Sequence, residues 1–139
     1  MYGALDISTS GMIAQRDRLT AISANLANKD SVSPDGTPFR AKRVFFQAGD
    51  PTAKSAEGRE LGVHIAAIKD DPAPFNYKFD PGNPRAYKSG PHAGYVAESN
   101  VNPVTEQVNA LEASRAYEAN VAAAEATKSM LAQALRLLA

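Results

Sequence analysis

Four large apolar residues recur every seven positions near the start of the chain: Leu5, Met12, Leu19 and Leu26. Ile22 occupies the companion heptad position, whereas Ser8 and Gln15 occupy it in the two preceding repeats. This pattern predicts a helix over residues 1–28 whose seam is only half apolar. Because such a helix is marginal by itself in water, we expect it to pack against partners on more than one side.

A second and longer helix is predicted over residues 102–139. Asn102 is suited to cap its N-terminus and Pro103 to occupy its first position, and Glu106 adds an acidic side chain in the first turns. No glycine or proline interrupts the rest of the segment, so the helix should extend for roughly 54 Å. Its apolar positions follow spacings of three and four, with Ser114 and Lys128 in the gaps: Val104, Val108, Leu111, Tyr117, Val121, Ala124, Leu131, Leu135 and Leu138.

Alanines recur every third residue in this helix, at positions 110, 113, 116, 119 and 122. Each step of three turns the helix by about 300°, so the series moves around the helix and does not line one face. The high helix propensity of alanine could explain the series by itself. Together with the length of the helix, however, the pattern favours close packing against several neighbours.

The segment between the helices, residues 29–101, has a different composition. All nine prolines lie between Pro34 and Pro103, and Pro-Asp-Gly and Asp-Pro-Gly sequences indicate turns. Four stretches are typical of strands: "FRAKRVFFQ", "LGVHIAAIKDD", "FNYKF" and "GYVAE". The sequence therefore predicts an α+β fold, in which long terminal helices form a coiled-coil-like pair and a small β-rich insertion of three or four strands lies between them.

The overall charge argues against several classes of function. Fifteen basic residues balance fifteen acidic ones, which disfavours a nucleic-acid-binding module.

The chain has no cysteine, so disulfides and thiol chemistry are excluded. No apolar run is long enough to predict insertion into a membrane, and the N-terminus does not have the pattern of a Sec-type signal peptide. We expect a soluble protein that is either cytoplasmic or exported with its N-terminus intact.

Candidates for catalysis are few, and we predict no catalytic residue, no metal site and no cofactor. His64 and His92 lie outside any recognised ligand spacing. Asp70 and Asp71 are adjacent, so in a strand their side chains would point to opposite faces. The basic cluster "RAKR", residues 40–43, would be spread over both faces of a strand, which predicts a solvated surface; an anionic partner is the less favoured alternative.

Two terminal stretches resemble the flagellar basal-body rod proteins of bacteria, and among them the C-type subunits of the proximal rod. The first stretch, residues 4–31, contains the S-x-N-L-A-N motif with Ser23, Asn25 and Asn28. The second, residues 94–135, contains a GYV strand, an NVN triplet and an S-R-x-Y-E-A-N-V helix. Its motif residues are Asn100, Asn102, Ser114, Arg115, Tyr117, Glu118 and Asn120.

The resemblance implies a structural subunit of the proximal rod, located in the flagellar basal body. Such subunits polymerise through their terminal helices into a hollow axial tube that transmits torque, after export by the flagellar type III apparatus. The implied partners are further copies, other rod subunits, the inner-membrane ring or rod adaptor, and the export apparatus.

We expect eleven apolar residues of the two helices to form contacts within and between subunits: Leu5, Met12, Leu19, Ile22, Leu26, Val108, Leu111, Tyr117, Val121, Leu131 and Leu135. Asn25 and Asn28 should end the first helix by binding its free carbonyl groups. Arg115 and Glu118 should link helices through polar contacts.

Two other functions are compatible with the residues alone. A cytoplasmic coiled-coil adaptor or chaperone would form a closed oligomer of fixed size, whereas a rod subunit would form an open-ended polymer. An enzyme in the β-rich middle would have to use His64 or His92, and the sequence offers no further support for it.

Overall fold

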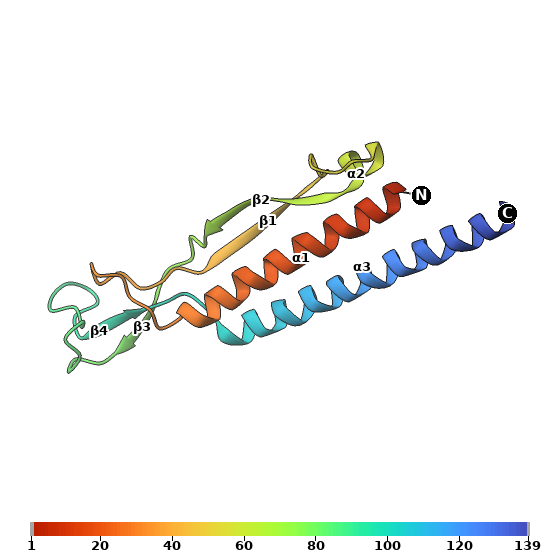
Figure 1. Cartoon of the computed structure of the whole chain (residues 1–139). Helices are drawn as coiled ribbons and strands as arrows, with labels where there is room; N and C mark the ends of the chain where they lie inside the picture. The colour runs from red at the N-terminus through yellow and green to blue at the C-terminus, as the bar shows by residue number, and fades with distance from the viewer. Residues whose placement is uncertain (1, 139) are drawn as a thin grey trace.

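The computed structural model describes residues 2–138 and arranges them in elongated layers (Figure 1). Helix α1 (Tyr2–Asn28) lies between the long helix α3 (Pro103–Leu138) and a β-hairpin formed by strands β1 (Lys42–Ala48) and β2 (Val63–Asp70). α1 and α3 run antiparallel, and α3 extends beyond the first turn of α1 (Figure 1). α1 is therefore the central element of the molecule, while α3 packs chiefly on α1.

The helix boundaries follow from local capping. The Oδ1 atom of Asn102 accepts hydrogen bonds from the backbone amides of Val104 at 3.0 Å and Thr105 at 3.3 Å, as expected for an N-cap. Pro103 occupies the first helical position, where a missing N–H costs nothing. α1 ends at Asn28, whose Nδ2 atom donates to the carbonyl of Ala24 at 2.9 Å.

β1 and β2 pair antiparallel over their full length, with an irregularity between Phe45 and Phe46. The short helix α2 (Ala56–Leu61) connects them at the tip of the hairpin, an element that the sequence did not predict. Ser55 caps α2, because its hydroxyl accepts a hydrogen bond from the amide of Gly58 at 3.0 Å. The hairpin follows α1 along its length, so that α2 lies near the first turns of α1 (Figure 1).

A second hairpin, β3 (Asn76–Phe79) and β4 (Tyr95–Glu98), lies beyond the other end of the helix pair (Figure 1). The loop between its strands is closed by two hydrogen bonds, from the amide of Tyr87 to the carbonyl of Tyr95 and from the amide of Gly94 to the carbonyl of Tyr87. Gly94 has a φ of +81°, and a Cβ there would lie 2.9 Å from the Phe79 ring, so this position requires glycine.

This architecture confirms the predicted α+β class, with long terminal helices and a small β-rich region between them. α1 ends at Asn28 and α3 begins at Pro103, while the division of the chain into segments 1–28, 29–101 and 102–139 stays a prediction. The predicted segments also include Met1 and Ala139, which lie outside the described residues. None of the helices within residues 2–138 is both long enough and apolar enough to span a bilayer.

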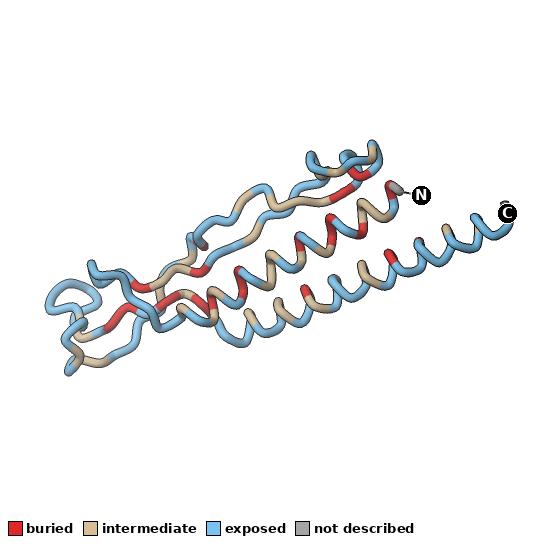
Figure 2. The backbone as a smooth tube through the Cα atoms, viewed as in Figure 1, coloured by how far each residue is buried: buried red, intermediate tan, exposed pale blue. Residues whose placement is uncertain are grey.

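The buried residues are mostly small or polar, and they lie along α1, on the side of α3 that faces it, and in the segment between the helices around the start of β1 and around β4 (Figure 2). Buried apolar positions of the helices are Ala14, Ala21, Ile22, Ala113 and Ala124. Among the side chains that the structure describes, the largest one that is fully buried is Asn25. Such a core buries little apolar area for each residue, so the isolated subunit gains limited stability from it.

Candidate functional site

The contact between α1 and α3, called here the helix seam, is built from small residues. Ala113 is completely buried, and Ala14 is nearly so. A Cβ added to Gly11 would lie 2.8 Å from the side-chain amide of Asn120, so the two helices approach closely at this level. Gly11 was not predicted as a seam residue, although a glycine inside a helical pattern is a recognised sign of close packing.

Polar contacts align the two helices. The Nη2 atom of Arg18 lies 3.5 Å from both Asn109 Oδ1 and Glu112 Oε2, and Asn25 donates to Glu106 at 3.1 Å. These contacts set residues 18–25 of α1 beside residues 106–112 of α3.

The polar link between helices that was expected from Arg115 and Glu118 is not made among residues 2–138 of the subunit and stays a prediction. Both residues are exposed, and neither forms a salt bridge with another residue in the described part of the chain. The salt bridge that joins α1 to α3 within the subunit is Arg18–Glu112, because these side chains lie on the facing sides of the two helices.

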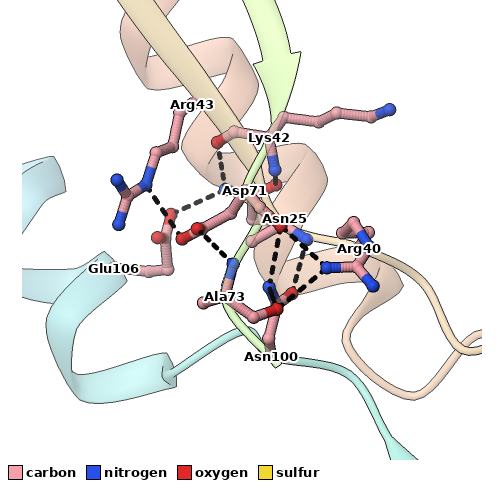
Figure 3. A network of polar contacts seen from close by, with 9 residues as sticks. Asn25, Arg40, Lys42, Arg43, Asp71, Ala73, Asn100 and Glu106 are labelled. Carbon is pink, nitrogen blue, oxygen red and sulfur yellow. Dashed lines mark hydrogen bonds and ion pairs between the residues drawn. The ribbon is translucent and has the colours of Figure 1, made fainter. Parts of the chain in front are cut away.

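A cluster called here the polar junction joins the end of α1, both strands of the first hairpin and the start of α3 (Figure 3). Asn25, 1% exposed, lies at its centre. Its Oδ1 atom accepts from the amide of Lys42 at 2.8 Å, and its Nδ2 atom donates to the carbonyl of Lys42 at 2.9 Å. The side chain therefore pairs with β1 as a neighbouring strand would.

The expected roles of the two motif asparagines in α1 are thus only half correct. Asn28 binds a free carbonyl of its own helix, as predicted. The prediction for Asn25 was wrong, because its amide is turned toward the first hairpin and bonds β1 in place of the helix end. A sequence pattern shows that an asparagine stands near a helix end, but not which element lies within reach.

Asn100 has a comparable role on the other side of the junction (Figure 3). Its Oδ1 atom accepts from the amide of Ala41 at 2.8 Å, and its Nδ2 atom donates to the carbonyls of Asp71 at 3.3 Å and Ala73 at 3.1 Å. The first asparagine of the NVN triplet therefore ties the hairpin to the segment before α3, while the second, Asn102, caps α3.

The basic cluster "RAKR" lies at this junction, where Lys42 and Arg43 are exposed, as the expected solvated surface requires, and Arg40 is half-buried. Arg40 donates to the carbonyls of Asp71 at 2.9 Å and Ala73 at 2.8 Å, and its guanidinium lies 4.2 Å from the centre of the Phe75 ring. Arg43 forms a salt bridge of 2.8 Å with the largely buried carboxylate of Asp71. Arg40 and Arg43 both bind groups of the same subunit. Because β1 and β2 pair antiparallel, the residues that follow β2 lie beside the start of β1 and place the Asp71 carboxylate and two backbone carbonyls within reach of the two guanidinium groups.

The remaining motif residues lie on or beside the helix pair. Ser23 is exposed on α1, and Ser114 is half-buried on α3. The Nδ2 atom of Asn120 donates to the carbonyl of Ala116 at 2.8 Å, which fixes its amide against Gly11.

The eleven predicted interface residues differ in burial. Ile22 is buried, whereas Leu5, Met12, Leu19, Leu26, Val121 and Leu131 are half-buried. Val108, Leu111, Tyr117 and Leu135 are exposed. Large apolar side chains therefore flank the seam or point away from it, and their role in assembly stays a prediction.

The two histidines have structural contacts. His64 Nδ1 is hydrogen-bonded to the carbonyl of Gly49, and the His92 ring stacks on Tyr77 with ring centres 4.0 Å apart. Within residues 2–138, no group of three or more histidine, aspartate or glutamate side chains is arranged to hold a metal ion.

One acidic side chain connects α1 to the tip of the first hairpin. Asp6 accepts a hydrogen bond from the amide of Ser55 at 2.9 Å, next to the start of α2. Hydrogen bonds from the Ser55 hydroxyl and amide hold the pKa of Asp6 below its ordinary value. The ionised carboxylate is thus the form that anchors this end of the hairpin.

A narrow helix seam, a polar junction that orients the β-rich region, and exposed apolar residues on α3 define a structural protein built for assembly. Comparisons with known proteins agree. Residues 5–33 match the family described as "Flagella basal body rod protein", and residues 92–137 match "Flagellar basal body rod FlgEFG protein C-terminal". The first match covers α1 from Leu5 onward, and the second covers β4, the NVN triplet and nearly all of α3.

Full-length relatives give the same result. The chain is 45% identical to the flagellar basal-body rod protein FlgC of Yersinia enterocolitica and 43% identical to that of Salmonella typhimurium, with 99% of this chain and 97% of each relative covered. It is 38% identical to FlgC of Borreliella burgdorferi with the same coverage. The chain therefore belongs to the flagellar basal-body rod protein family, as a structural subunit of the proximal rod.

This membership confirms two expectations from the sequence. The chain acts in the rod of the flagellar basal body, and it is not an enzyme, since the family consists of structural proteins. The alternative of a closed cytoplasmic adaptor is not favoured.

Proposed function

We propose that this subunit polymerises through α1 and α3, with copies of itself and with other rod subunits, into a hollow axial tube that transmits torque. The observation that carries the proposal is the unpartnered surface of α3. This helix packs chiefly on α1, and Leu137 near its end is 89% exposed. A 36-residue helix covered along one side needs further neighbours to bury its apolar side chains.

The eleven predicted interface residues would act at two levels. Leu5, Met12, Leu19 and Leu26 share one side of α1 because they repeat every seven residues, and all four are half-buried. A neighbouring subunit could complete their burial. Val108, Leu111 and Leu135 are exposed on α3 and would make contacts between subunits alone.

Export by the flagellar type III apparatus fits the composition of the helix seam. Because alanine and glycine bury less apolar area than leucine, the isolated helix pair has limited stability and can be kept unfolded for transport. Folding would then be completed on assembly, when neighbouring helices cover the exposed residues. Inactivating the export apparatus should leave the chain in the cytoplasm; normal incorporation into rods would contradict this route.

Contacts with the inner-membrane ring or rod adaptor are proposed from the proximal position of the subunit. A photoreactive amino acid at Leu137, which is 89% exposed near the end of α3, would test this. An adduct with the adaptor supports the proposal. Adducts formed with rod subunits alone would show that this end of α3 does not reach the adaptor.

The decisive experiment is mass spectrometry on purified hook–basal-body particles. We expect the chain to remain after the membrane rings have been stripped, in a fixed ratio to other rod subunits. If the chain is absent from these particles and found only in the cytoplasm, the closed-oligomer alternative is preferred. Sedimentation of the purified chain over a range of concentrations would then show one oligomer of fixed size.

A further inference from the structure

The outer face of α3 carries an apolar ridge near its N-terminal end. Val104, Val108 and Leu111 are 68%, 53% and 52% exposed, and their spacings of four and three place them on one face. Arg115 follows Leu111 by four residues and is also exposed, so it continues the same face. We call these four residues the outer ridge.

A groove lies on the opposite side of the helix pair, between α1 and the first hairpin. It has a volume of about 520 Å³. Its floor on α1 is formed by the small side chains of Thr20, Ala21 and Ala24. Its wall is formed by Ile65 and Ile68 of β2 and by Lys42 of β1, whose ammonium group is paired with Asp70. We call this the hairpin groove. Asp17 lies at the end of the groove that is nearer to the start of α1.

The groove and the ridge lie at the same level along the helix axis. Asn25 contacts Glu106 and Arg18 contacts Asn109, so residues 18–25 of α1 run beside the α3 turns that carry Val108 and Leu111. On α1 the groove runs from Asp17 to Ala24, which is roughly 10 Å of helix, and on α3 the ridge runs from Val104 to Arg115, which is roughly 16 Å. The ridge therefore covers the full length of the groove and extends beyond it.

We propose that the outer ridge of one copy docks into the hairpin groove of a second copy. The two copies are parallel and side by side, and the contact is heterologous, so that it continues from subunit to subunit around a ring or a helix. This inference rests on the proposed function and names the lateral surfaces of that assembly.

The charges fit a parallel arrangement. Arg115 stands at the end of the ridge that points toward the C-terminus of α3, and Asp17 stands at the same end of the groove because the two helices are antiparallel. In parallel copies the two side chains meet, whereas a two-fold dimer would place them at opposite ends. The pairing of Asp17 with Arg16 within the subunit is exposed and therefore weak enough to be exchanged.

Engineered disulfides test the contact, since the chain contains no cysteine of its own. The double variant Ile68→Cys with Val108→Cys places one thiol on the groove and one on the ridge. Within a subunit these positions lie on opposite sides of the helix pair, so any disulfide joins two copies. Leu61→Cys with Val108→Cys is the matched control, because Leu61 is also exposed but lies at the far end of the hairpin.

Oxidised hook–basal bodies that contain the first pair should give a ladder of covalent oligomers on a non-reducing gel, and the control pair should not. Intact rods without this ladder would overturn the proposal, as would a ladder from the control pair alone. If the wild-type chain is itself absent from purified rods, the proposed function fails, which is a different result.

A charge exchange covers the case in which the cysteine variants do not assemble. Asp17→Arg and Arg115→Asp should each reduce the swimming halo, and the double variant should recover most of the loss. Equal or greater loss in the double variant would contradict the Asp17–Arg115 contact. Circular dichroism and sedimentation of each purified variant should be unchanged, since both positions are at the surface of the subunit.

Discussion

The side-chain amide of Asn120 lies directly against the backbone of Gly11, at the distance where a Cβ on the glycine would stand 2.8 Å from the amide atoms. A hydrogen bond of 2.8 Å to the carbonyl of Ala116 holds the Asn120 side chain in this position. The glycine is therefore the reason why a polar side chain fits between two closely packed helices.

Replacing Gly11 with leucine should destabilise the subunit by about 1–3 kcal/mol, the usual cost of overpacking a closely packed contact. Thermal or denaturant unfolding followed by circular dichroism would measure this loss. Thr9→Leu is the control, because Thr9 is exposed on the same helix.

A double-mutant cycle can assign this cost to the contact with Asn120. Gly11→Ala should destabilise the wild-type background more than the Asn120→Ala background, since truncation of the asparagine provides room for the new Cβ. Equal effects in both backgrounds would show that the two residues are not coupled.

Asn25→Ala should have a larger effect than Asn28→Ala, although both residues belong to the same short motif. The first substitution removes the hydrogen bonds to the amide and the carbonyl of Lys42 and to Glu106, each worth about 0.5–1.5 kcal/mol. The second removes one local bond to Ala24, worth about 0.5–1.5 kcal/mol. Hydrogen exchange should also become faster at the Lys42 amide in the first variant alone. Equal protection of this amide in both variants would contradict the assigned role of Asn25.

Acidification should loosen α2 from α1. The hydrogen bonds from Ser55 lower the pKa of Asp6 below the ordinary value of 3.8 in the folded state only. The anchoring is therefore complete above pH 3.8 and is lost as the pH falls through the lowered folded pKa. Asp35 and Asp50 also have lowered pKa values through hydrogen bonds from Thr37 and Thr52, so global unfolding does not isolate this effect.

The measurement for Asp6 must be local, for example the amide shift of Ser55 in an NMR titration. In the Asp6→Asn variant the shift should no longer change with pH in this range, because the titrating group is absent. An unchanged titration curve in this variant would assign the effect to another residue.

The two long helices and the four strands could be predicted from sequence because they depend on local signals. The Asn102-Pro103 cap and the heptad repeat of leucines act within a few residues, and the structure places both helices where these signals do. α2 was missed because six residues provide little periodicity, and its cap, Ser55, is stabilised by Asp6 from a distant part of the chain.

The polar junction could not be predicted for a related reason. Asn25, Arg40 and Asn100 are far apart in sequence, and their partners are mainly backbone groups, which leave no trace in the amino-acid pattern. The helix seam was predicted in part. The alanine series favoured close packing, and the helices do approach through alanine and glycine. The heptad positions suggested apolar contacts within and between subunits, but Leu19 is only half-buried beside the seam, so its contact with another subunit stays a prediction.

Leu19→Asp should separate folding of the subunit from its assembly. Leu19 is half-buried on the side of α1 shared with Leu5, Met12 and Leu26, so a carboxylate at this position can still reach solvent in the monomer. Once a neighbouring subunit covers this side, the same carboxylate would be buried without a partner, which is strongly unfavourable. We therefore expect a soluble monomer with wild-type helicity that does not form rods, so that cells carrying it do not swim.

Thr9→Asp introduces the same charge at an exposed position of α1 and should leave motility intact. Normal swimming with Leu19→Asp would show that this side of α1 faces solvent in the assembled rod, and loss of helicity in the monomer would assign Leu19 to the fold of the subunit.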